Sequence, residues 1–156
     1  PKKLMAYLVR WYARNRAEPE LAAALIDGLN TPISPAMSPP QDGEISQRTE
    51  EVVGPYELHD FFLYHWLRFG ASPTKIFYLA CDSFADHHAP ETIQHWLAQF
   101  FRRFMTQQFK RTTLPPGPKV GSVSLSPRGD WRMPDEAGFS QLVDEVESLL
   151  NPPSDS

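Results

Sequence analysis

The fold is decided by residues 90–109, which read PETIQHWLAQFFRRFMTQQF. Large apolar side chains recur in this stretch at spacings of three and four residues: Ile93, Trp96, Leu97, Phe100, Phe101, Phe104, Met105 and Phe109. This is the period of an α-helix with one wide apolar face. The stretch therefore predicts one long helix, buried along one side, which the prolines at 115, 116 and 118 prevent from continuing.

A cationic edge borders the apolar stripe of this predicted helix. Arg103 and Lys110 lie seven positions apart, so at about 100° per residue they are nearly eclipsed. The wider basic group of this region comprises Arg102, Arg103, Lys110, Arg111 and Lys119. Arginine and lysine beside glycine-rich backbone suit a phosphate or a carboxylate. An ion-paired or solvated helix face gives the same pattern, so the residues alone leave both interpretations open.

Four further amphipathic helices are indicated, over residues 4–12, 19–28, 55–69 and 73–79, and a last one over residues 135–150. Gly28 and Gly70 are placed to end two of them. Ser72 and Asp135 are of the type that caps a helix N-terminus. Residues 119–134 read as ordered, extended chain with a short β-like alternation from Val120 to Leu125. The pattern predicts a mainly α fold.

Domain organisation follows from the prolines and the length. The 156 residues fit one domain, and we expect residues 1–150 to form it and residues 151–156 to be a disordered tail. Residues 29–49 are too long and too proline-rich for a simple connector, which predicts a mobile, substrate-facing loop. Because the chain starts at Pro1 and enters a helix pattern at once, we expect it to be a piece of a longer protein.

Composition and charge argue against several classes of protein. A net charge of −4 and a pI near 5.7 argue against a nucleic-acid binder or an acidic-membrane binder. The single cysteine, Cys81, cannot form an internal disulfide, and no apolar run is long enough to span a membrane. We therefore expect a cytoplasmic protein. His88, Glu91 and His95 have a spacing that metal ligands can use, but surface polar residues explain them better, and no metal site is predicted.

Several strings of the chain resemble the C-terminal part of the synthetase domain of bacterial glutamine-dependent NAD synthetases. They are GPYELHDFFLY (54–64), RRF (102–104), QQFKR (107–111) and GPKVGSVSLSPRGDWRMP (117–134). The resemblance covers most of the chain. It implies a helical portion of an α/β adenine-nucleotide alpha-hydrolase-like (ATP pyrophosphatase) domain, here without the parallel sheet of that domain.

The resemblance also implies a reaction. ATP and magnesium adenylate the nicotinate carboxylate of deamido-NAD, and ammonia from a glutaminase domain then displaces AMP to give NAD. The Ser-Gly-Gly-x-Asp-Ser loop that grips ATP in the family is absent from this sequence, so we expect no catalytic residue and no activity in the isolated chain. The implied partners are the rest of the synthetase, deamido-NAD, ATP, ammonia and further copies of the protein in a homo-oligomer.

Site residues are carried over from the resemblance one at a time. Lys110 matches a lysine that contacts deamido-NAD, whereas Thr31 matches a threonine of the ATP-contacting loop and Glu50 an acidic residue of a mobile loop. Arg103, Lys119 and Arg128 are further candidates for contact with an anion. For Arg128, Asp130 and Arg132, pairing within the ordered segment is the preferred interpretation. The competing classes are a helical protein-interaction module and a nucleic-acid-binding module.

Overall fold

The computed structural model describes residues 2–31 and 54–150, and these divide into two compact units, Pro1–Glu57 and Leu58–Ser156. The described residues form helices and connecting loops and contain no strand. The mainly α prediction is therefore confirmed, and the alternation from Val120 to Leu125 forms a loop. Most of the segment 29–49, and all of residues 151–156, lie outside the described residues.

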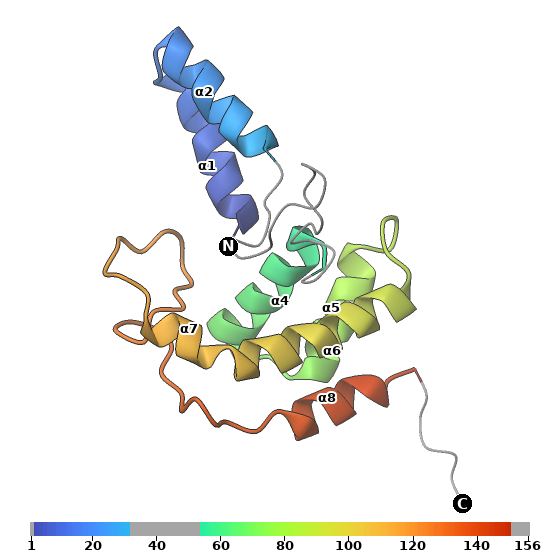
Figure 1. Cartoon of the computed structure of the whole chain (residues 1–156). Helices are drawn as coiled ribbons and strands as arrows, with labels where there is room; N and C mark the ends of the chain where they lie inside the picture. Colours follow the sequence, from blue (N-terminus) through green and yellow to red (C-terminus); the bar gives the residue numbers. More distant parts are fainter. Residues whose placement is uncertain (1, 32–53, 151–156) are drawn as a thin grey trace, which may run out of the picture. The chain divides into compact units, whose positions relative to one another are not determined.

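The first unit is a helical hairpin. Helix α1 (Lys2–Asn15) packs against α2 (Pro19–Asn30), and Pro19 occupies the first turn of α2 (Figure 1). Gly28 does not end α2 as predicted, because the helix continues to Asn30 and the N–H of Thr31 caps it on the carbonyl of Asp27.

Helix α1 is amphipathic, as the pattern over residues 4–12 predicts, but much of its apolar stripe is exposed. Of its large side chains, Met5 is 45% exposed, Leu8 42%, Trp11 54% and Tyr12 45%. Ala13 is the buried residue of this helix, and α2 has no buried residue. The reason is that a hairpin of two helices cannot enclose an apolar face as wide as the one that α1 carries.

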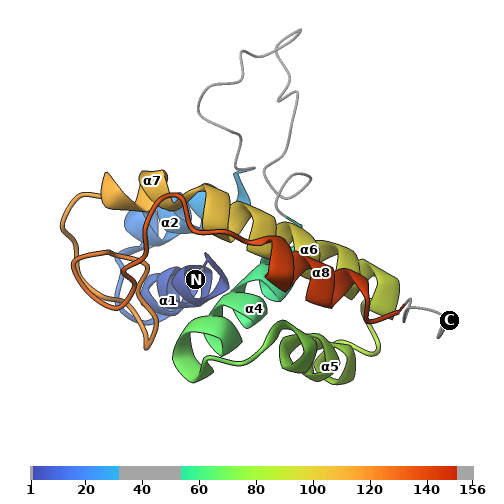
Figure 2. The same ribbon diagram turned by 90° about the horizontal axis from the view of Figure 1, so that it is seen from below.

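The second unit is built around α6 (Pro90–Thr106). Helix α8 (Ser140–Glu147) lies alongside α6, and α5 (Pro73–Ser83) packs against both (Figures 1 and 2). Helix α4 (Tyr56–Phe69) contributes aromatic rings to α6: the Trp66 and Phe101 centroids lie 5.0 Å apart, and those of Phe62 and Phe100 lie 5.8 Å apart. The core is thus a layer of aromatic and branched side chains between α6 and its neighbours.

The predicted apolar stripe of α6 forms this core over most of its length. Its buried members are Ile93, Leu97, Phe100, Phe101 and Phe104, and Ala98, which the prediction did not include, is buried with them. From α8, Val143 and Val146 are buried against them. Helix α8 begins at Ser140, five residues after the predicted cap at Asp135, because residues 134–137 form a turn in which the Ala137 N–H meets the Pro134 carbonyl.

Two end signals read from the sequence are confirmed. The Ser72 hydroxyl accepts a hydrogen bond from the Lys75 N–H at 3.3 Å, which caps α5. Gly70 has φ +59, the left-handed conformation that ends α4, and its N–H meets the Trp66 carbonyl at 3.0 Å.

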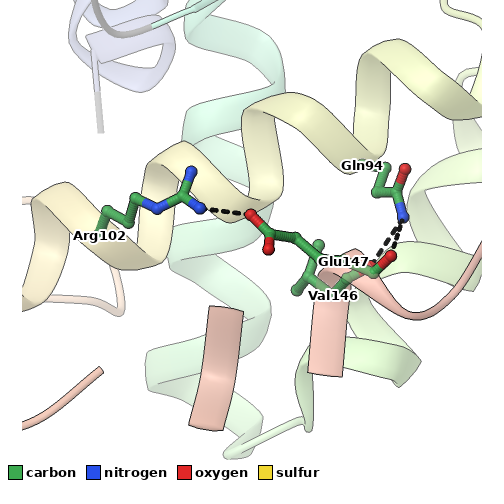
Figure 3. Close-up of polar contacts among 4 residues, drawn as sticks. All are labelled: Gln94, Arg102, Val146 and Glu147. Atoms are coloured by element: carbon green, nitrogen blue, oxygen red, sulfur yellow. Dashed lines mark hydrogen bonds and ion pairs between the residues drawn. The ribbon is translucent and has the colours of Figure 1, made fainter. Parts of the chain in front are cut away.

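Long-range polar contacts attach α8 to the unit (Figure 3). The Gln94 amide donates to the carbonyls of Val146 at 2.8 Å and Glu147 at 3.2 Å, and Arg102 pairs with the Glu147 carboxylate. On the other side, the Glu145 carboxylate accepts two hydrogen bonds from Thr74, at 2.9 Å from its N–H and 2.6 Å from its hydroxyl. This places a negative charge at the N-terminus of α5, where the helix dipole favours it.

Candidate functional site

The candidate site lies where α6 ends. The prediction that one helix continues through Phe109 is wrong, because α6 ends at Thr106 and a separate short helix, α7, runs from Gln108 to Thr112. Gln107 between them has φ −103 and ψ 21, which is not helical. The break changes which residues face the core: Phe109 is 50% exposed, whereas Gln108 is only 1% exposed.

A buried polar network holds α7 in place. The Arg111 Nε donates to Gln108 Oε1 at 2.7 Å, and a second guanidinium nitrogen of Arg111 donates to the Phe104 carbonyl. The guanidinium also lies 4.3 Å from the centre of the Phe104 ring. Gln108 in turn donates to the Met133 carbonyl at 3.2 Å. Arg111 and Gln108 therefore tie the end of α6, helix α7 and the following loop together.

Burial lowers the pKa of Arg111, and the charge of Asp135 acts in the opposite direction. An arginine remains protonated even so, which means that the carbonyl and amide oxygens around it must stabilise a dehydrated cation. The sequence pattern placed Arg111 in the basic group of this region and gave no role to Gln108. The signal that could have found them is the pair of polar residues three apart that follows directly on the apolar stripe.

Lys110 lies on α7 between these two buried residues and is itself exposed. Its ammonium is 5.9 Å from the centre of the Phe109 ring, a weak cation–π contact. In the described part of the chain Lys110 forms no ion pair. The geometry gives a cation held on a fixed helix, with its charge available to an external anion.

The other predicted cations do not form one continuous edge. Arg102 is paired with Glu147, Arg111 is buried, and the Lys119 ammonium lies 2.6 Å from a carboxylate oxygen of Asp130. Arg103 is exposed on the last turn of α6, and Gln107, which is not helical, separates it from Lys110 on α7. The two basic residues 103 and 110 therefore do not share the one continuous helix on which the predicted eclipse depended.

The loop from 119 to 132 uses its charged side chains for its own structure. The Asp130 carboxylate accepts from the Ser124 N–H at 3.1 Å as well as from Lys119. Arg128 donates to the Leu114 carbonyl at 2.8 Å, and Arg132 donates to the Pro127 carbonyl at 3.0 Å. These contacts agree with the preferred interpretation of pairing within an ordered segment.

The two residues assigned to loops fall outside this region. The Thr31 hydroxyl donates to the Asp27 carbonyl at 3.0 Å at the end of α2, which is a capping role. Glu50 lies outside the described residues. In residues 2–31 and 54–150, no three His, Cys, Asp or Glu side chains gather in a way that could hold a metal ion. None of the described helices combines the length and apolar character that a bilayer crossing requires.

The second unit is a set of helices around one aromatic core. It carries the loop from 119 to 132 and an exposed lysine, Lys110, on the short helix α7 that the buried network holds in place. These features define a helical segment with a candidate contact for an anion. Over 94% of its length, the chain is similar to glutamine-dependent NAD(+) synthetases. It is 39% identical to that of Mycobacterium leprae (strain TN) and 35% identical to those of Mycobacterium tuberculosis (strain ATCC 25618 / H37Rv) and Mycobacterium bovis (strain ATCC BAA-935 / AF2122/97). No family model matches the chain.

The chain spans only 24% of the length of these relatives. The resemblance inferred from the sequence is confirmed to this extent: the chain corresponds to a segment that makes up about a quarter of a glutamine-dependent NAD(+) synthetase.

Proposed function

We propose that this chain acts as the helical C-terminal part of a ligase that makes NAD from deamido-NAD, ATP and glutamine-derived ammonia. The observation that carries the proposal is the similarity over 94% of the chain to glutamine-dependent NAD(+) synthetases. In this proposal ATP and magnesium activate the nicotinate carboxylate, and their binding falls mainly to the part of the relatives beyond the matched quarter. The whole enzyme is proposed to work in the cytoplasm as a homo-oligomer.

Within this segment, Lys110 is the proposed contact for deamido-NAD. Three features support the assignment: its exposed ammonium, the absence of an ion pair among the described residues, and the buried network on either side that fixes α7. A flexible lysine on a fixed backbone suits an anionic group, because its charge can follow the ligand at little cost to the fold. Arg103 is a secondary candidate on the same grounds of exposure.

Thr31 remains the proposed contact for ATP and Glu50 a proposed loop residue. The bond from the Thr31 hydroxyl to Asp27 leaves the oxygen of that hydroxyl able to accept a further hydrogen bond. Lys119 and Arg128 are weaker candidates for substrate contact, because each already has a partner within the loop.

The experiment that tests this function uses the longer synthetase containing this sequence. Lys110→Ala is expected to raise the KM for deamido-NAD or to slow adenylation by roughly ten- to a hundredfold, the effect of losing one charge-assisted contact. Glutaminase activity and thermal stability should not change. The control is Lys75→Ala, which removes an exposed positive charge from α5 at a residue that is not a candidate for substrate contact. Normal synthetase kinetics in the Lys110 variant would reject the assignment.

A further inference from the structure

The second unit contains a small open cavity, and Lys110 is not one of the residues that line it. It has a volume of about 150 Å³ and is formed by the end of α4 and the loop from 119 to 132. The residues that line it are Leu67, Arg68, Lys119, Ser122, Val123, Ser124 and Asp130. One water takes about 30 Å³ in the liquid, so the cavity has room for a small polyatomic ligand.

The charges around the cavity favour an anion. Arg68 and Lys119 are cations, and the one carboxylate, Asp130, is already bound to Lys119 and to the Ser124 N–H. Arg68 lies near enough to contribute to the lowered pKa of Asp130, whose largest cause is the hydrogen bond from Lys119. The lining therefore carries one more positive than negative charge, which is unfavourable for a metal cation.

Hydrogen-bond donors remain available at the same cavity. Arg68 has five N–H groups, and in the described part of the chain its side chain forms no hydrogen bond or ion pair. Lys119 uses one of its three donors on Asp130. Ser122 adds a hydroxyl, and Gly121, with φ +77, makes the turn that brings Ser122 to the cavity next to Lys119.

We propose that this cavity binds a tetrahedral oxyanion of the phosphate type, held by Arg68, Lys119 and Ser122. Asp130 orients Lys119 and keeps the loop closed around the ligand. Lys119 is also a weaker candidate for substrate contact, but Arg68 and Ser122 have no part in the proposed synthetase function, so either proposal can fail without the other.

The test uses the purified chain and inorganic phosphate, titrated at pH 7 and constant ionic strength with chloride as the balancing anion. Amide resonances of Ser122 and Ser124 are expected to shift in a saturable way, and acetate should bind at least tenfold more weakly because it is planar and carries fewer acceptors. Phosphate that produces no saturable shift, or acetate that binds as tightly, would overturn the proposal.

Two variants and one control assign the effect to the cavity. Arg68→Gln should weaken phosphate binding about tenfold and Ser122→Ala about fivefold, since a charged and a neutral donor are lost respectively. Both residues are exposed, so the spectra should keep native dispersion. Arg103→Gln removes the same charge away from the cavity and should leave the affinity unchanged. Equal weakening by Arg103→Gln would show unspecific attraction and reject the site.

Discussion

Replacing Arg111 by alanine should destabilise the second unit, because the buried network at the end of α6 loses its centre. The change leaves Gln108 Oε1 and the Phe104 carbonyl without the donors that now serve them. Each buried acceptor left unsatisfied costs roughly 1–3 kcal/mol, and a cation–π contact adds about 1 kcal/mol. Relief of the dehydrated guanidinium offsets part of this. We expect a net loss of about 3 kcal/mol in the free energy of unfolding.

Urea unfolding of the purified chain measures this loss. Tryptophan fluorescence is a suitable signal, because the Trp131 ring lies 5.2 Å from the Phe104 ring and reports on the packing beside the network. The matched control is Arg103→Ala: an exposed residue whose side chain has no partner among residues 2–31 and 54–150 should change stability by no more than about 0.5 kcal/mol.

A double-mutant cycle tests the network itself. Arg111→Met and Gln108→Met remove both partners of the 2.7 Å bond, so the double variant should lose about 1 kcal/mol less than the sum of the two single losses. Strict additivity, or an Arg111→Ala variant as stable as the Arg103 control, would refute the view that these two residues brace α7.

Three further outcomes are expected. The pKa of the Asp130 carboxyl should lie below the ordinary value of 3.8, because the hydrogen bond from Lys119 lowers it. The stability that this carboxylate contributes is then present above the unfolded-state pKa and is lost as the pH falls through the lower folded-state pKa. In an NMR titration, Lys119→Met should raise the pH at the midpoint of the Asp130 titration. Glu145→Gln should reduce stability by about 1 kcal/mol in thermal unfolding, since the carboxylate that accepts both Thr74 bonds becomes a neutral amide, and an unchanged melting temperature would contradict this. The purified chain should self-associate and bind a hydrophobic dye through the exposed face of α1, and Trp11→Lys should reduce both; a monomer in sedimentation that binds no dye would oppose this expectation.

Much of the second unit could be predicted from local patterns. The three- and four-residue spacing from Ile93 to Phe104 placed the core face of α6, because a helix that buries one side needs that period. Ser72 and Gly70 marked the start of α5 and the end of α4, since a hydroxyl cap and a left-handed glycine act through the backbone next to them.

The candidate site was harder to predict from the sequence, because tertiary contacts determine its structure. Gln107 is a good helix former and gives no sign that α6 ends there. With the break, Gln108 and Arg111 are buried on the core side, where Gln108 donates to the carbonyl of Met133, 25 residues away in sequence. The partners of the cations were equally hidden: Arg102 meets Glu147 across 45 residues, and no local period encodes such a pair.

The attachment of α8 also determines when the fold can be completed. The partner of Thr74 is the carboxylate of Glu145, 71 residues later in the chain. The partners of Gln94 are the carbonyls of Val146 and Glu147, which follow it by 52 and 53 residues. During synthesis, at about 5–20 residues per second, the ribosome therefore releases α4, α5 and α6 several seconds before the helix that covers them. Through that interval the apolar side of α6 facing α8 is open to water and to chaperones, and it closes only when residues 140–147 emerge.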